Sequence, residues 1–86
     1  MTMDNVIFFT ISLDPNTHLW DIISVDPEYD TFSQRQIYGG SQFMVMQEIT
    51  DSIAKEYDKT AAFVVGDDSP DLTVVKVENA YVLHQE

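Results

Sequence analysis

The chain of 86 residues contains no cysteine and only four basic residues. The absence of cysteine excludes a disulfide scaffold, a cysteine-ligated zinc site and a thiol nucleophile. Because small secreted domains usually depend on disulfides, it favours an intracellular, cytoplasmic location. The scarcity of lysine and arginine argues against direct contact with nucleic acid, whose phosphates are neutralised by these side chains.

Long hydrophobic runs are also lacking. No apolar stretch reaches the roughly 18–20 residues that a membrane-spanning helix requires. Residues 6–13 are apolar, but they follow Asp4 and run into Asp14-Pro15, which is typical of a strand and not of a signal peptide. Anionic membrane surfaces would repel a chain whose net charge is −11. We therefore expect no contact with a membrane.

The composition is nevertheless that of a folded protein. Apolar residues make up 44% of the chain and aromatic residues 12%, which is enough for a core despite the charge. A chain of this length forms one small domain with a single core. We therefore treat residues 1–86 as a single acidic domain.

Two segments near the N-terminus predict a hairpin. Residues 5–13 and 18–25 are rich in β-branched and aromatic residues, and turn-forming residues separate them. If residues 14–17 form the loop, Leu13 opposes His18. One face of the hairpin is then strongly apolar: Ile7, Phe9, Ile11, Leu13, Trp20 and Ile22. The other face ends in an apolar group that requires a second layer or a partner subunit and is a candidate dimer surface: Val6, Phe8, Ile23 and Val25.

The rest of the chain predicts one long helix and further strands. Residues 26–40 leave two alternatives open, a short helical turn capped by Thr31 and Gln34 or a third strand over residues 33–38. From residue 41 onward, apolar residues recur every four positions, which predicts a helix ending near Asp58: Val45, Ile49, Ile53 and Tyr57, with Phe43 and Met46 beside them. Three later segments are expected in strands: residues 61–65, 72–77 and 81–84.

This order of elements, β-β-x-α-β-β, predicts an α+β fold. We expect an antiparallel sheet of four or five strands with local hairpins at both ends. One main helix would pack on one face of that sheet.

No residue pattern indicates an enzyme, a metal site or a cofactor. His18 and His84 are not accompanied by a pattern that would build a catalytic triad. The alternating Asp26, Glu28 and Asp30 resemble calcium ligands, but the glycine and glutamate that an EF-hand loop needs are replaced by threonine and isoleucine. We therefore expect no catalytic residue, no metal and no cofactor.

Acidic residues are spread over every predicted element. Six of the 15 precede Arg35, and the first 34 residues contain no lysine or arginine. Such self-repulsion costs stability, whereas long-range attraction speeds association with a basic partner surface. The expected partner is a basic protein, above all a nucleic-acid-binding enzyme, and the candidate contact residues are Asp14, Asp21, Asp26, Glu28, Asp30, Glu48, Asp51, Asp67, Asp68 and Asp71.

The scale of this charge matches a short piece of DNA. Duplex DNA carries about one charge per 1.7 Å of axis, so 15 carboxylates correspond to about 25 Å of duplex. In size, charge and all-round acidity the chain is similar to small phage-encoded DNA mimics that block restriction or CRISPR nucleases. This predicts an inhibitor that mimics DNA charge, acting in the host cytoplasm if a phage encodes it.

Three other interpretations stay open. In the first, the chain is an immunity protein or antitoxin that neutralises a basic toxin. In the second, it is a homodimeric module of unknown role. In the third interpretation the acidity serves only solubility.

Overall fold

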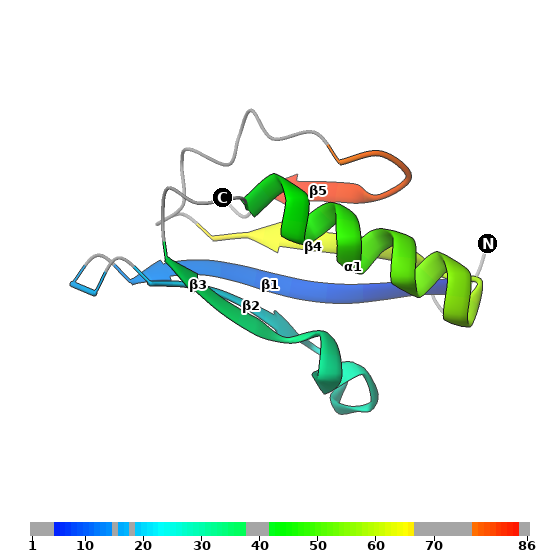
Figure 1. Ribbon diagram of the computed structural model, residues 1–86, viewed down its shortest axis with the longest axis horizontal. Coiled ribbons are helices and arrows are strands. Elements are labelled where there is room, and N and C mark those ends of the chain that lie inside the picture. Colours follow the sequence, from blue (N-terminus) through cyan, green and yellow to red (C-terminus); the bar gives the residue numbers. More distant parts are fainter. Residues whose placement is uncertain (1–4, 15, 18, 38–41, 67–76, 85–86) are drawn as a thin grey trace.

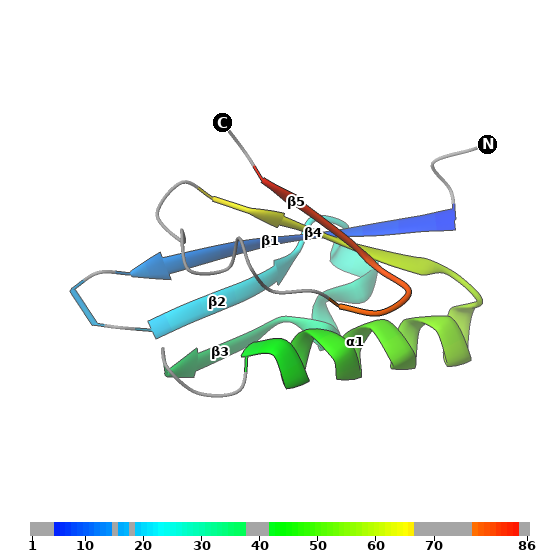
Figure 2. The ribbon, with the colours of Figure 1, turned by 90° about the horizontal axis from the view of Figure 1, so that it is seen from above.

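The computed structural model of the chain describes residues 5–14, 16–17, 19–37, 42–66 and 77–84. These residues form an α+β fold in which a five-stranded sheet of order β3-β2-β1-β4-β5 carries the helix α1 on one face (Figures 1 and 2). In chain order the elements are β1 (Val6–Asp14), β2 (Leu19–Ser24), the 3-10 helix η2 (Pro27–Phe32), β3 (Gln34–Ile37), α1 (Gln42–Tyr57), β4 (Thr60–Val65) and β5 (Tyr81–His84).

The sheet is mixed, so the prediction of an antiparallel sheet was wrong. β2 pairs antiparallel with both β1 and β3, but β1 pairs parallel with β4, and β4 pairs parallel with β5. The expected second hairpin is therefore replaced by two parallel strands. A tight turn cannot join parallel neighbours such as β4 and β5. The strand expected over residues 72–77 lies outside the described residues, except for Val77, which is buried.

The first hairpin is confirmed, but its register differs from the expected one. Leu13 pairs with Trp20 and not with His18, because β1 continues to Asp14, which pairs with Leu19. The shift amounts to two residues in the partner strand, and an even shift keeps every side chain on its face of the sheet. The predicted apolar face is accordingly the buried one, with the side chain of Leu13 outside the described part: Ile7, Phe9, Ile11, Trp20 and Ile22.

Residues 26–37 contain both of the structures left open as alternatives. The helical turn is η2, but it begins before Thr31, because Asp26-Pro27 supplies a stronger start signal. The Oδ1 atom of Asp26 accepts a hydrogen bond of 3.0 Å from the backbone N–H of Glu28. The third strand is β3, which pairs with β2 along the edge of the sheet.

The predicted helix is confirmed and closes the core. Met46, Ile49 and Ile53 of α1 are almost fully buried in the same hydrophobic cluster as the inner face of the sheet. Within that cluster the rings of Phe9 and Phe63 stack with their centroids 5.5 Å apart. The helix ends at Tyr57, and Asp58 follows with a positive φ of 55°, in the left-handed region that commonly terminates helices.

A side-chain amide attaches the turn before β5 to the helix. Gln47 Nε2 donates to the carbonyl oxygen of Glu78 over 3.1 Å, and Gln47 Oε1 accepts from the Glu78 N–H over 3.0 Å. One side chain thus satisfies both backbone groups of a residue that lies 31 positions later in the chain. This contact fixes the start of β5 relative to α1.

Two methionines of α1 offer a matched test of this core. Met46 is fully buried and Met44 is 60% exposed, and both lie in the first turns of the same helix. We expect Met46→Ala to lower the free energy of unfolding by about 2–4 kcal/mol, because it removes buried apolar atoms and leaves a cavity. Met44→Ala should change it by less than about 0.5 kcal/mol. Urea denaturation followed by circular dichroism measures both, and equal effects would contradict this packing of α1.

Candidate acidic binding surface

Two Glu-Tyr-Asp tripeptides meet at one end of the molecule. The first is Glu28-Tyr29-Asp30 in η2, and the second is Glu56-Tyr57-Asp58 at the end of α1. The two tyrosine rings pack edge to face with centroids 5.1 Å apart, and Tyr29 is buried. Phe32 also contacts the Tyr57 ring, at 6.2 Å. The aromatic contacts therefore hold together two segments whose carboxylates flank the rings.

The acidic residues of these segments, together with the cap of η2, are all exposed. We refer to them as the end cluster: Asp26, Glu28, Asp30, Glu56 and Asp58. One lysine accompanies them, since Lys59 Nζ donates to the hydroxyl of Tyr29 over 3.3 Å and lies 5.8 Å from the centre of its ring. Because the five carboxylates outnumber this one ammonium group, the cluster together with Lys59 carries a net negative charge.

Backbone and side-chain hydrogen bonds hold η2 in place. Ser24 is buried, and its Oγ donates to the carbonyl oxygen of Asp26 over 2.6 Å, while its N–H donates to Ser33 Oγ over 2.9 Å. The N–H groups of Tyr29 and Ser33 donate to the carbonyl oxygens of Asp26 and Asp30, respectively. Both ends of η2 are thus tied, and its two acidic residues, together with the capping Asp26, are held on a fixed backbone.

A shallow depression of about 440 Å³ lies beside the end cluster. Its apolar side comes from the start of β1 and the residue after β2, and its polar side comes from η2 and Lys59. The lining residues are Val6, Ile7, Phe8, Val25, Asp26, Glu28, Tyr29 and Lys59. The depression is open to solvent, so it offers a place for one side chain of a partner and not an enclosed site for a small molecule.

A second acidic group lies on the outer side of α1. Glu48 and Asp51 are exposed on the helix, and the Gln47 amide brings exposed Glu78 next to them. We call these three residues the helix cluster. Lys55 lies four residues after Asp51 on the same side of the helix and reduces the net charge there.

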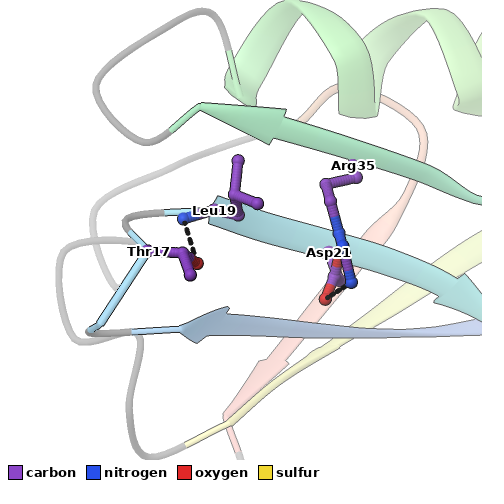
Figure 3. Close-up of polar contacts among 4 residues, drawn as sticks. All are labelled: Thr17, Leu19, Asp21 and Arg35. Carbon is purple, nitrogen blue, oxygen red and sulfur yellow. Dashed lines mark hydrogen bonds and ion pairs between the residues drawn. The ribbon is translucent and has the colours of Figure 1, made fainter.

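The remaining predicted contact residues are distributed differently. Asp14 lies at the opposite end of β1, where its Oδ1 accepts from the Asn16 N–H over 2.9 Å. Asp21 forms a salt bridge of 2.7 Å with Arg35 Nε across β2 and β3 (Figure 3), and this carboxylate raises the pKa of Arg35. Figure 3 also shows Thr17 Oγ1, which accepts from the Leu19 N–H. Asp67, Asp68 and Asp71 lie outside the described residues.

Sequence reasoning missed Glu56, Asp58 and Glu78 as members of these clusters. The repeated Glu-Tyr-Asp pattern was a signal that could have predicted Glu56 and Asp58, because its two tyrosines suggest that the two copies pack together. Nothing in the sequence pairs Glu78 with α1, because Gln47 is one of several similar polar residues on the helix.

The four candidate dimer residues lie on the face of the sheet that is opposite α1. Val6 and Phe8 are half-buried, whereas Ile23 is 49% exposed and Val25 is 61% exposed. Phe8 accepts a backbone hydrogen bond of 3.0 Å from the Val25 N–H, so these two residues are neighbours. The apolar group expected from the sequence is therefore contiguous at this end of the sheet.

The described part of the chain contains no group of three or more histidine, aspartate or glutamate side chains placed to hold a metal ion. Nor do the described residues contain a helix that has the length and apolarity to cross a membrane. The side chains of His18 and His84 lie outside the described residues.

The chain matches no protein-family model, no curated protein and no solved structure.

Repulsion among the carboxylates of the end cluster should lower the stability of the fold. Replacing Glu28 and Glu56 together by glutamine removes two like charges from neighbouring segments. We expect the urea midpoint to rise by about 0.2–0.5 M in 0.01 M salt. The gain should shrink in 1 M salt, where the screening length falls from about 30 Å to about 3 Å.

Asp21→Asn is the control for that experiment, because it removes a carboxylate that is paired with Arg35. It should lower the midpoint slightly or leave it unchanged. A double variant that is less stable than the wild type at low salt would show that the five acids do not repel one another.

Proposed function

We propose that this protein is a small acidic binding protein that occupies a basic groove of a nucleic-acid-binding enzyme or complex and excludes the nucleic acid. The observation that carries the proposal is the end cluster, in which five exposed carboxylates belong to two segments that the contact between Tyr29 and Tyr57 holds together. A charge array on a fixed backbone binds a basic surface with little further loss of conformational freedom.

The dimensions of the molecule support this proposal. The longest extent is 37 Å, so a net charge of −11 corresponds to about one charge per 3.4 Å. This equals the spacing of phosphates along one strand of duplex DNA, about 3.4 Å. A basic groove would thus meet the charge density of one DNA strand, which is about half that of the whole duplex with its one charge per about 1.7 Å.

The distribution of the charge favours binding by one end and by the helix side. The end cluster and the helix cluster lie on surfaces built by η2, α1 and the turn at Glu78, whereas Asp21 is neutralised by Arg35. We therefore assign the partner contacts first to Asp26, Glu28 and Asp30 with Glu56 and Asp58, and second to the helix cluster. Asp14 and the acids at positions 67, 68 and 71 extend the candidate set.

The first experiment identifies a partner and tests competition. The chain, immobilised by one terminus, captures proteins from a cell extract in low salt, and a short DNA duplex is then used for elution. We expect a nucleic-acid-binding protein to be released by the duplex, because both ligands occupy the same basic surface. Release by high salt but not by duplex would contradict DNA mimicry and favour an immunity protein or antitoxin that binds its toxin elsewhere.

The second experiment locates the contact surface with two variants of equal charge change. One carries Glu28→Gln, Asp30→Asn and Glu56→Gln in the end cluster. The other carries Glu48→Gln, Asp51→Asn and Glu78→Gln in the helix cluster. We expect the first variant to raise the Kd for the purified partner at least about tenfold, or about 1.4 kcal/mol, and the second to raise it less.

The salt dependence of both variants provides the physical check. The Kd of the wild type should rise steeply with salt, and the slope should be smaller for the end-cluster variant, because fewer charges take part. Wild-type binding that is equally tight in low and high salt would contradict an electrostatic mechanism.

A further inference from the structure

The face of the sheet opposite α1 is uncovered in the described part of the molecule. We call it the open face; no described helix or strand lies over it in Figure 2. The pairing of the strands places the following residues on it: Val6, Phe8, Thr10, Ser12, Asp14, Leu19, Asp21, Ile23, Val25, Arg35, Thr60, Ala62, Val64, Tyr81 and Leu83.

Large apolar side chains are exposed across this face. Ile23 and Val25 come from the β2 side of the sheet, and Tyr81 at 50% and Leu83 at 45% come from β5. Between them lie Phe8 and Val64, which are half-buried, and Ala62, which pairs with Phe8 and is itself buried. Exposed apolar side chains gathered on one face of a small domain mark an interaction site.

The charge of the open face distinguishes it from the rest of the surface. Its charged members are Asp14, Asp21 and Arg35, and the last two neutralise each other in the salt bridge of 2.7 Å. The helix cluster belongs to another surface, and the end cluster adjoins the open face at its margin, where Asp26 and Glu28 line the same depression as Phe8 and Val25. Among its described residues the face itself thus has a net charge of −1, and Asp14 at the far end of β1 is the carboxylate without a salt bridge that a second copy meets there.

The size of the face suits an interface between two copies. Its five strands contain 29 residues. At about 3.3 Å per residue and about 4.8 Å between strands, they cover about 460 Å² of flat sheet. Two such faces together have a flat area of about 900 Å², which leaves out the extra surface of protruding side chains. This area is slightly below the roughly 1,000 Å² of buried surface that a specific interface requires.

We propose that two copies of the chain associate face to face through their open faces, about a two-fold axis. The two sheets would pack about 10 Å apart, as in other sheet-on-sheet layers. The interface is then isologous, with β1 and β4 at its centre, Ile23 and Val25 on one side of them and Tyr81 and Leu83 on the other. The helices lie on the two outer sides, and both end clusters stay exposed.

This dimer goes beyond the proposed function, because it does not depend on which partner the acids bind. It would place two end clusters on one particle and double its net charge. It would also leave the depression beside Val6, Phe8 and Val25 at the rim of the interface.

Sedimentation equilibrium over a range of concentrations and two salt concentrations tests the dimer. We expect a reversible dimer whose dissociation constant falls when the salt rises from 0.01 M to 1 M, because salt screens the repulsion between two chains of charge −11. Salt has the opposite effect on binding to a basic partner, so failure of the dimer and failure of the proposed function are distinguishable. A wild type that stays monomeric at millimolar concentration in 1 M salt would overturn the proposal.

Two glutamate variants locate the interface. Ile23→Glu introduces a charge on the open face, and Met44→Glu introduces the same charge on α1 at a residue of similar exposure, 60% against 49%. We expect Ile23→Glu to raise the dimer dissociation constant more than tenfold and Met44→Glu to raise it less than threefold. Equal effects would overturn the assignment of the interface to the open face.

A gentler variant covers the case in which Ile23→Glu does not fold. Threonine keeps the β-branched shape that strands favour, so Ile23→Thr with Leu83→Thr removes exposed apolar surface from β2 and β5 and preserves the sheet. Thermal unfolding at low protein concentration confirms that the fold is retained. A folded double variant that dimerises as tightly as the wild type would also overturn the proposal.

Discussion

The parallel pairing of β1 with β4 at the centre of the sheet is the constraint on which the rest of the structure depends. Parallel strands need a long crossover, and the chain supplies it with α1 between β3 and β4. One helix covers one face, so Ile7, Phe9 and Ile11 of β1 are buried beneath it. Phe8 on the same strand lies on the opposite face. The covered face became the core, and the uncovered face kept its apolar residues without a described layer above them.

The placement of the charges follows from the same layout. The sheet excludes unpaired acids from its inner face, and on its outer face Asp21 is matched by Arg35. Five other described acids, those of the end cluster, gather at η2 and at the end of α1. There the packing of Tyr29 against Tyr57 offsets the repulsion between the carboxylates on either side of each ring. Aromatic packing thus makes a dense negative surface compatible with a stable fold.

The sequence was informative wherever a local period determines the structure. The four-residue spacing of Val45, Ile49 and Ile53 predicted both the helix and its buried side. The alternation in β1 and β2 predicted the correct inner face even though the register was wrong, because an even shift preserves it. The direction of β5 could not be read in this way, since a short apolar strand has the same composition whether its neighbour is parallel or antiparallel. The end cluster escaped prediction for a related reason: Asp26 and Glu56 are 30 residues apart, and tertiary contacts between aromatic rings bring their segments together.

The contact between Gln47 and Glu78 has a consequence for the order in which the molecule assembles. β5 pairs with β4 on one side, and the turn before it rests on a helix side chain, so β5 can dock only after α1 and β4 are in place. The body formed by β1 to β4 and α1 already contains most of the hydrophobic cluster. We therefore expect the C-terminal strand to form last on folding and to open first in the native state, at a lower free energy than the body. β5 then opens by local unfolding while the four-stranded body stays folded. The amide hydrogens of Tyr81–His84 therefore exchange before those of β1.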